Sequence, residues 1–388
     1  MKQEKGDKKS SKKILIIFVV ILLLVVVGAS VWWWLTQRDK DNNGDGVGQG
    51  GNHIEKVYSK LTGLEVIDES VNSAPTFCVQ IPNGSTDGAR PQAGLTQAGV
   101  VFEAIAETGI TRFAAVFQAP TTGIIGPIRS LRPYYLDWDT PFDCTVVHDG
   151  GSHEALTAIA QGGQRNLDED FRYMWKVNDS SRLWNNVFTS PSKLQEFNDS
   201  KGYITSNPKT FPRLTPEEVE ADRLIPECTK NEAGECIEPA GSNDVFVNQI
   251  QASFTGIHDY NIQYTYDATT NRYLRSYAQG GAHMTYDCPA GVTEFANCGA
   301  PVQVAPSSVV LMRVQESTMS DGYHENIATI STGSAYIFQN GKLIEGTWRK
   351  TAQNHQISFL NAAGEEIAFT PGQIWISAIP QFGNISWE

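Results

Sequence analysis

The sequence predicts an α+β protein: a mixed α/β part is followed by a β-rich, mostly antiparallel part, behind one N-terminal transmembrane helix. Three observations support this prediction. An unbroken apolar run near the N-terminus has the length of a membrane span. A strand, a glycine turn and a helical pattern in the first half are typical of an α/β unit. From residue 243 onward, short alternating runs indicate antiparallel strands.

The apolar run covers residues 14–35 and contains neither a charge nor a proline. Its length of about 22 residues matches the roughly 20 that a helix needs to cross a bilayer. Residues 1–13 carry six lysines against two acids, and basic flanks stay in the cytoplasm. We therefore expect a single-pass signal-anchor in the cell membrane, with the N-terminus cytoplasmic and the folded domains extracytoplasmic. The alternative is a signal peptide cleaved near residues 28–30, but such peptides have apolar cores of about 7 to 15 residues.

The charge of the chain limits its partners. The formal net charge is −13, and removing the +4 of residues 1–13 leaves −17 on the rest. Nucleic acid is excluded as a partner, because phosphate binding requires a basic surface. The expected partners are the cytoplasmic membrane, through the N-terminal helix, and an anionic cell-wall polymer or peptidoglycan at a local site. We expect no cofactor.

The chain has six cysteines, and all of them follow the apolar run. An even number in an oxidising compartment suggests disulfides, although six cysteines allow 15 pairings. The pairs that spacing favours are Cys228–Cys236, Cys288–Cys298 and Cys78–Cys144. The first two would close short loops that contain glycine, and the third would join two neighbouring strands. No pair has the CxxC spacing of a zinc site, so we expect no structural metal.

Composition divides the chain into segments. The predicted order is a cytoplasmic basic tail (1–13), the transmembrane anchor (14–35), a flexible linker (36–56), an α/β N-terminal domain (57–205), a connector (206–242) and a β-rich C-terminal domain (243–388). The linker assignment rests on its richness in glycine, asparagine and aspartate.

In the first domain, residues 76–81, 100–106 and 111–117 are apolar and rich enough in β-branched or aromatic residues to predict strands. Thr108-Gly109 suits a hairpin between the last two, and a helix over residues 97–107 is the alternative. Cys144 to Val147 predicts a short buried strand that leads into a glycine turn. Ser152 then suits the N-cap of a helix over residues 154–159.

Later in the chain, Thr215-Pro216 predicts the start of a short helix. The predicted strands that follow are residues 261–266, 308–313, 335–338, 356–360 and 373–379. Asn340-Gly341 is the strongest hairpin signal, so we expect an antiparallel sandwich or sheet. Trp348 and Trp375 are expected in the core, with a sugar-stacking role as the alternative.

Four arginines lie in loops or at strand ends of the first domain, and arginine is the usual residue for a bidentate grip on phosphate or carboxylate. The glycine-rich helix start near residue 150 would add free N–H groups and the positive end of a helix dipole. Together these features predict an anion pocket. Its expected ligand-binding residues are Arg90, Arg112, Arg129, Ser130, Arg132, His148, Gly150, Gly151 and Ser152. The alternative is that each arginine pairs with a carboxylate among Glu103, Glu107, Asp137 and Asp139.

Catalytic residues are not identified, and the candidates are Glu103 and Asp149. Glu103 and Glu107 are four apart, so on a regular strand both would face one side and could share acid/base work. His148, Asp149 and His153 lie close together in sequence and suit either an N-cap cluster or, as the alternative, a metal site. Ser152 lacks the G-x-S-x-G context of a nucleophile.

Several motifs resemble the YerB-like family of bacterial envelope lipoproteins. The matching segments are residues 90–94 (RPQAG), 100–104 (VVFEA), 111–113 (TRF), 126–133 (GPIRSLRP), 148–152 (HDGGS), 272–275 (RYLR), 346–350 (GTWRK) and 371–376 (PGQIWI). This resemblance covers most of residues 57–383 and implies an envelope location, with N- and C-terminal domains both present. The family is classed as of unknown function, so the resemblance implies no reaction.

The chain departs from that family at three places. Pro82 and Gly99 stand where such proteins carry aspartate, and Trp184-Asn185-Asn186 stands where they show Pro-His-Asn. An apolar helix also replaces the lipid anchor. A looser likeness in pattern to the LytR-CpsA-Psr enzymes, which move polyprenyl-linked wall polymers, gives the alternative of a glycan- or phosphate-processing enzyme. We prefer a membrane-tethered binding module, because no nucleophile is recognisable.

Overall fold

The structure, a computed structural model, describes residues 56–223, 229–230, 236–237 and 246–388. The predicted tail, the predicted transmembrane helix, nearly all of the linker and part of the connector lie outside these residues, as does Cys228 of one predicted disulfide. None of the helices in the described part of the chain combines the length and the apolar character of a membrane span.

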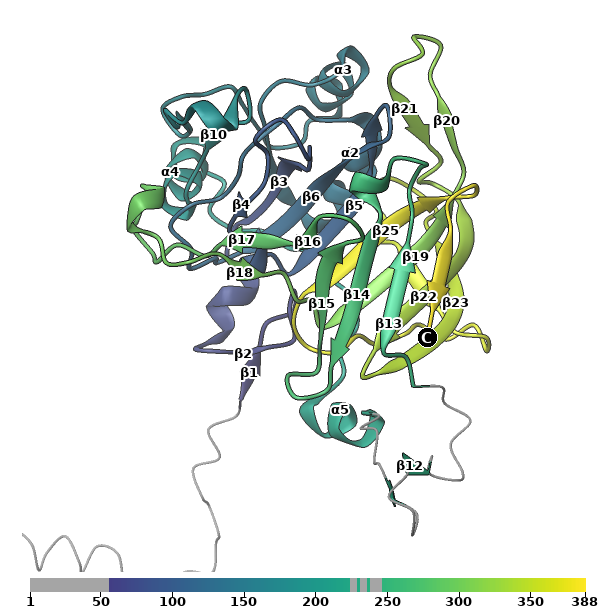
Figure 1. The fold of residues 1–388 in the computed structure, drawn as a ribbon. Helices are drawn as coiled ribbons and strands as arrows, with labels where there is room; N and C mark the ends of the chain where they lie inside the picture. The colour runs from purple at the N-terminus through teal and green to yellow at the C-terminus, as the bar shows by residue number, and fades with distance from the viewer. Residues whose placement is uncertain (1–55, 224–228, 231–235, 238–245) are drawn as a thin grey trace, which may run out of the picture. The chain divides into compact units, whose positions relative to one another are not determined.

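A mixed sheet of ten strands forms the centre of residues 56–388 (Figure 1). Its order is β24-β23-β22-β19-β25-β5-β6-β3-β7-β8. The bounds are β3 (Thr76–Pro82), β5 (Val100–Glu107), β6 (Ile110–Gln118), β7 (Cys144–His148), β8 (Asn166–Asp168), β19 (Ser308–Val314), β22 (Thr332–Gln339), β23 (Lys342–Arg349), β24 (Ser358–Leu360) and β25 (Ile374–Pro380). β3, β7 and β8 run parallel, as do β5, β25 and β19, and the other neighbouring strands are antiparallel.

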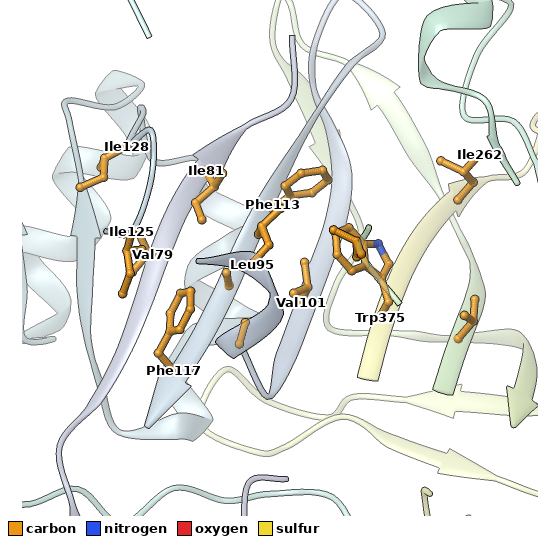
Figure 2. Close-up of a cluster of buried hydrophobic side chains, with 14 of the residues drawn as sticks. Val79, Ile81, Leu95, Val101, Phe113, Phe117, Ile125, Ile128, Ile262 and Trp375 are labelled. Atoms are coloured by element: carbon orange, nitrogen blue, oxygen red, sulfur yellow. The ribbon is translucent and has the colours of Figure 1, made fainter. Parts of the chain in front are cut away.

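A second, five-stranded antiparallel sheet packs on one face of the first (Figure 1). Its order is β16-β15-β14-β13-β26, with bounds β13 (Gln249–Ala252), β14 (Ile262–Asp267), β15 (Arg272–Tyr277), β16 (Gly281–Ala282) and β26 (Ile385–Trp387). Alternate side chains of both sheets meet in one hydrophobic core, because successive residues of a strand point to opposite faces. Figure 2 shows Phe113, Val101 and Trp375 of the large sheet in this core, together with Ile262 of the small one.

Two helices, α2 (Pro133–Asp139) and α3 (His153–Gly162), cover part of the opposite face of the large sheet. α4 (Pro191–Lys201) places Leu194 and Phe197 in the first core, with the small sheet, and α5 (Pro216–Asp222) has no buried residues. Aromatic residues of α2 and apolar residues of α3 pack with Phe102, Ala114 and Val116 in a second core. The burial of these apolar faces on both sides of one sheet is the main source of stability expected for such a layered fold.

The remaining elements are short. Strand pairs are formed by β1 (Val57–Tyr58) with β2 (Glu65–Val66), β9 (Trp175–Lys176) with β10 (Val187–Phe188), β11 (Thr229–Lys230) with β12 (Cys236–Ile237), and β20 (Glu316–Thr318) with β21 (Glu325–Ile327). A three-stranded sheet joins β4 (Gln92–Ala93), β17 (Met284–Tyr286) and β18 (Val302–Gln303). The 3-10 helices are η1 (Glu69–Ser73), η2 (Leu95–Gln97), η3 (Thr140–Phe142), η4 (Ser180–Arg182), η5 (His258–Tyr260) and η6 (Phe295–Asn297).

The two predicted domains share the large sheet. β25, from the C-terminal part, pairs in parallel with β5, from the N-terminal part, so that Ile374 lies opposite Val100. β17 and β4 form a second parallel pairing across the same boundary. We call this boundary, defined by the β5–β25 and β4–β17 pairings, the seam. The division of residues 57–388 into two domains stays a prediction. At the seam, backbone hydrogen bonds join the N-terminal part to the C-terminal part.

Most of the predicted elements are present. The hairpin turns at Thr108-Gly109 and Asn340-Gly341 have positive φ at both residues, as tight hairpins require. Ser152 caps α3, accepting a hydrogen bond from the Ala155 N–H at 3.3 Å. α5 begins with Pro216 behind a capping box. The mixed α/β first part and the β-rich, mostly antiparallel second part are confirmed.

Two of the predicted disulfides are confirmed, namely Cys78–Cys144 and Cys288–Cys298. The first joins the neighbouring parallel strands β3 and β7, as expected. Trp348 and Trp375 are both buried, which confirms their place in the core.

Two local expectations are wrong. The alternative of a helix over residues 97–107 fails, because β5 occupies residues 100–107. The expectation that Glu103 and Glu107 face one side fails because the register with β6 shifts between Ile105 and Glu107. A bulge of this kind inserts an extra residue and turns the following side chain to the other face. Glu103 therefore points toward the small sheet, whereas Glu107 points with Arg112 to the opposite face.

Candidate functional site

The four arginines do not converge on one cavity. Arg112, Arg129 and Arg132 lie near one another at one end of β6, where Arg112 contributes electrostatically to the environment of both others. Arg90 turns to the other face of the large sheet and lines a cavity there. The site predicted from sequence is thus divided between two faces of the sheet.

Arg112 and Arg132 share a single carboxylate. Glu107 Oε1 accepts from Arg112 Nη2 at 3.0 Å, and its Oε2 accepts from Arg132 Nη2 at 2.7 Å. Burial acts to raise the pKa of Glu107, but the charges of the two arginines outweigh it and lower that pKa. Arg112 also donates to the Ser130 carbonyl oxygen. Both guanidinium groups are buried, so this cluster fixes the bulge of β5 to the loop before α2.

Arg129 is more open. Its Nη1 lies 3.3 Å from Asp149 Oδ2, and its Nε donates to Asn185 Oδ1 at 2.9 Å. Burial lowers the pKa of Arg129 and raises that of Asp149, although the opposite charge of each partner offsets part of the shift. Asn185, one of the residues that departs from the family pattern, thus holds Arg129, and its amide Nδ2 donates to the Asp87 carbonyl oxygen.

Two of the N–H donors at the predicted helix start are used within the protein. The Gly150 N–H donates to Asp168 Oδ1 at 2.8 Å, and the Ser152 N–H donates to the Leu131 carbonyl oxygen. His148 is buried, with its ring nitrogens 2.7 Å from the Gly150 carbonyl oxygen and from Asn166 Oδ1. Gly151 forms a β-bridge with Leu131. These contacts fix the turn between β7 and α3.

Arg90 lines a cavity of about 460 Å³ at the seam. The guanidinium lies over the ring of Tyr277, with its Cζ 3.5 Å from the ring centroid. Its Nε donates to Asn83 Oδ1 at 2.9 Å, and its Nη2 donates to the Asp259 carbonyl oxygen at 3.3 Å. The Nη1 group has no hydrogen-bond partner among the described residues and remains available to a ligand. His283 lines the same cavity.

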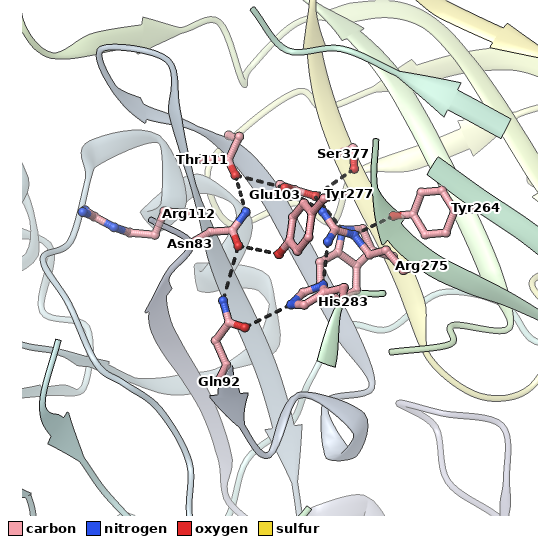
Figure 3. A network of polar contacts seen from close by, with 12 residues as sticks. Asn83, Gln92, Glu103, Thr111, Arg112, Tyr264, Arg275, Tyr277, His283 and Ser377 are labelled. Atoms are coloured by element: carbon pink, nitrogen blue, oxygen red, sulfur yellow. Dashed lines mark hydrogen bonds and ion pairs between the residues drawn. The ribbon is translucent and has the colours of Figure 1, made fainter. Parts of the chain in front are cut away.

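A buried polar network lies behind this cavity (Figure 3). At its centre, Arg275 Nη2 lies 3.0 and 2.9 Å from the two carboxylate oxygens of Glu103, and both residues are fully buried. Glu103 also accepts from Thr111 Oγ1, Trp375 Nε1 and Ser377 Oγ. Figure 3 shows Arg112 pointing away from these groups, in agreement with its place on the other face.

The network reaches the cavity through hydrogen bonds. Arg275 Nη1 donates to His283 Nδ1, so the proton of the neutral imidazole is on Nε2, which donates to Gln92 Oε1 at 3.0 Å. Burial and then Arg275 lower the pKa of His283 well below its usual value. Tyr277 donates its hydroxyl to Asn83 Oδ1 at 2.6 Å, the same oxygen that holds Arg90. The orientation of Arg90 is therefore tied to the core.

This arrangement suits binding better than proton transfer. Glu103 makes all of its hydrogen bonds inside the protein and is not among the residues that line the cavity. His283 has both ring nitrogens engaged. In the described part of the chain, no three His, Cys, Asp or Glu side chains gather as ligands of a metal ion.

Sequence reasoning missed Arg275, Tyr277 and His283. A signal for Arg275 exists in the alternation of β15, where Tyr273, Arg275 and Tyr277 occupy the buried positions. An arginine in the buried register of an amphipathic strand requires a partner, because an unpaired buried charge is strongly destabilising. The partner itself, Glu103, is 172 residues away in sequence.

Comparison with known proteins identifies the family of the chain. The model of the N-terminal domain of a protein of unknown function, DUF3048, matches residues 61–204, and the model of its C-terminal domain matches residues 252–376. A relative from Bacillus subtilis (strain 168), provisionally named lipoprotein YerB, is 28% identical over 338 residues, which are 86% of this chain and 89% of the relative. The crystal structure of YerB protein from Bacillus subtilis matches with a TM-score of 0.66 at 25% identity, over 85% of this chain and 100% of that structure. The resemblance read from the motifs is confirmed, and the chain belongs to the DUF3048 family of proteins of unknown function.

Proposed function

We propose that the protein is a membrane-tethered envelope component that binds an anionic group of a cell-wall-related ligand in the Arg90 cavity. The location is supported by the name of the relative, a lipoprotein, and by the apolar run at residues 14–35. The binding function is carried by one observation. A partly exposed arginine, whose Nη1 has no partner within the described part of the chain, lines a cavity whose back wall is a hydrogen-bonded network.

The cavity has the properties of a ligand site. Its volume of about 460 Å³ lies in the range of about 300–1,000 Å³ that is usual for small-molecule pockets. Ser85 and Thr86 supply hydroxyl groups at its rim, and Met284 supplies an apolar surface. Because Arg90 is already stacked on Tyr277 and held by Asn83, little side-chain entropy is lost when an anion binds.

A binding function is preferred to the enzyme alternative because the predicted catalytic apparatus is occupied. Arg112 and Arg132 neutralise Glu107, and Glu103 neutralises Arg275. These groups hold the fold together. The carboxylate that does line the Arg90 cavity is that of Asp259, which accepts a hydrogen bond from Ser85 Oγ at 2.7 Å.

The test is anion binding by the full-length protein in detergent micelles. The ligands are poly(glycerol phosphate) and a wall stem peptide with a free carboxylate, and calorimetry gives the dissociation constants. Arg90→Ala removes a charge-assisted hydrogen bond worth about 1.5–3 kcal/mol, so we expect affinity to fall roughly tenfold or more. Ala282→Trp, an exposed lining position, should block the cavity.

The matched control is Ala278→Trp, an exposed alanine four positions away that does not line the cavity. It should bind like the wild type. If Arg90→Ala and Ala282→Trp both keep wild-type affinity for every ligand that binds, the Arg90 site is the wrong one. Covalent change of a ligand during the incubation would instead support the enzyme alternative.

A further inference from the structure

A second cavity, of about 670 Å³, lies between β9, the first turn of α4 and the loop that contains η6. Trp175 and Phe295 form its aromatic walls, and Lys176, Asp179, Lys193 and Glu294 supply charged groups. β9 and α4 belong to the N-terminal part of the chain, whereas Phe295 belongs to the C-terminal part. None of these residues takes part in the Arg90 cavity.

The aromatic walls are held rigidly. Trp175 lies directly opposite Phe188 in the β9–β10 pair. The ring of Phe295 meets Phe188 edge to face at 5.1 Å and Tyr286 in the same way at 5.1 Å. The disulfide Cys288–Cys298 closes the loop that carries Phe295. Because each wall is fixed before any ligand binds, the two rings form a preorganised apolar surface.

The charges in the cavity balance. Lys176 and Lys193 face Asp179 and Glu294, so the four side chains sum to zero. Lys193 is also paired with Glu196 at 2.7 Å, and Asp179 accepts hydrogen bonds from Ser181. A polyanion would gain little attraction here. Groups that can donate and accept hydrogen bonds nevertheless remain around the rim, including the hydroxyl of Ser192.

We propose that this cavity binds an uncharged oligosaccharide. A sugar ring has an apolar C–H face that packs on an aromatic side chain and a rim of hydroxyl groups that bond to polar side chains. Trp175 and Phe295 offer the first kind of contact, and Lys176, Asp179 and Ser192 offer the second. This site does not depend on the anion site, with which it shares no lining residue.

The test uses full-length protein in detergent micelles and calorimetric titration with chitotetraose, an oligomer of N-acetylglucosamine. Ala296 is exposed and lines the cavity, so Ala296→Trp should fill it and weaken binding at least tenfold. Ala290 is exposed in the same disulfide-closed loop but does not line the cavity, so Ala290→Trp serves as the matched control and should bind like the wild type. Equal melting temperatures of the two variants confirm that the fold is unchanged.

Arg90→Ala should bind chitotetraose normally, which separates this site from the anion site. The proposal is overturned if chitotetraose fails to bind at millimolar concentration, or if Ala296→Trp binds it as well as Ala290→Trp does. A wall stem peptide that binds in place of the sugar, and is lost only in Ala296→Trp, would also overturn it, because the cavity would then be a peptide site.

Discussion

At the scale of single residues, the turn at Leu183 combines an unfavourable backbone conformation with exposed apolar side chains. Leu183 has φ 46° and ψ −118°, a backbone conformation that favours glycine. The Asn185 N–H donates to the Arg182 carbonyl oxygen at 2.7 Å and closes the turn. Arg182 and Asn185 are buried, whereas Leu183 and Trp184 are 50% and 63% exposed. Two buried residues therefore hold a strained turn that presents two large apolar side chains to solvent.

The strain at Leu183 can be measured by comparing two substitutions. A side chain with a Cβ atom costs roughly 1–2 kcal/mol in the left-handed region, against about 0.5–1 kcal/mol of extra chain entropy for glycine. We expect Leu183→Gly to be more stable than Leu183→Ala by about 0.5–1 kcal/mol, measured by urea unfolding. Both variants remove the same exposed side chain, so the comparison isolates the backbone. An alanine variant as stable as the glycine variant would show that the turn relaxes.

At the scale of elements, local patterns in the sequence predict β3, β5, β6, β7, β19, β22 and β25, because each is a short apolar or alternating run between turn residues. The capped starts of α3 and α5 and the turn at Asn340-Gly341 have equally local causes. The bulge before Glu107 has no comparable signal, because it results from the register between two strands. The separation of Arg90 from the other three arginines has no local signal either, so the sequence identified the arginines but assigned all four to one pocket.

The β20–β21 hairpin contains a pair of carboxyl groups that the sequence did not reveal. Glu316 is half-buried. Glu325 lies on the partner strand opposite Thr318, two residues along β20 from Glu316. Burial, and then the charge of Glu325, raise the pKa of Glu316 to about 8. This carboxyl group is therefore mostly protonated in the folded protein at neutral pH.

The raised pKa of Glu316 predicts a pH-dependent stability. Between the unfolded pKa of about 4.5 and the folded value of about 8, the folded state binds more protons than the unfolded state, so the free energy of unfolding falls as pH rises. We expect Glu316→Gln, which keeps a neutral side chain, to remove this part of the fall between pH 5 and 8. Guanidinium unfolding at several pH values measures it. Curves of wild type and variant that run parallel over this window would contradict the assignment.

At the scale of the whole molecule, the seam joins two parts that the sequence describes separately. β25 completes the large sheet beside β5, and Arg275 crosses to Glu103 beneath it. Neither contact could be predicted from the sequence, because parallel pairing and long-range ion pairs leave no local periodicity. The seam also explains why both cavities combine residues from the two parts: each opens where loops of one part meet loops of the other.

The Glu103–Arg275 pair should control the stability of both parts together. Removing one partner leaves the other as an uncompensated buried charge, so Glu103→Gln and Arg275→Met should each lower the free energy of unfolding by about 3–5 kcal/mol. The double variant buries no unpaired charge, so its loss should be much smaller than the sum of the two. Because one sheet runs through the seam, near-UV and far-UV circular dichroism should report a single transition for all three variants. Additive losses would show that the two groups act independently, and two separate transitions would show that the parts fold as autonomous domains.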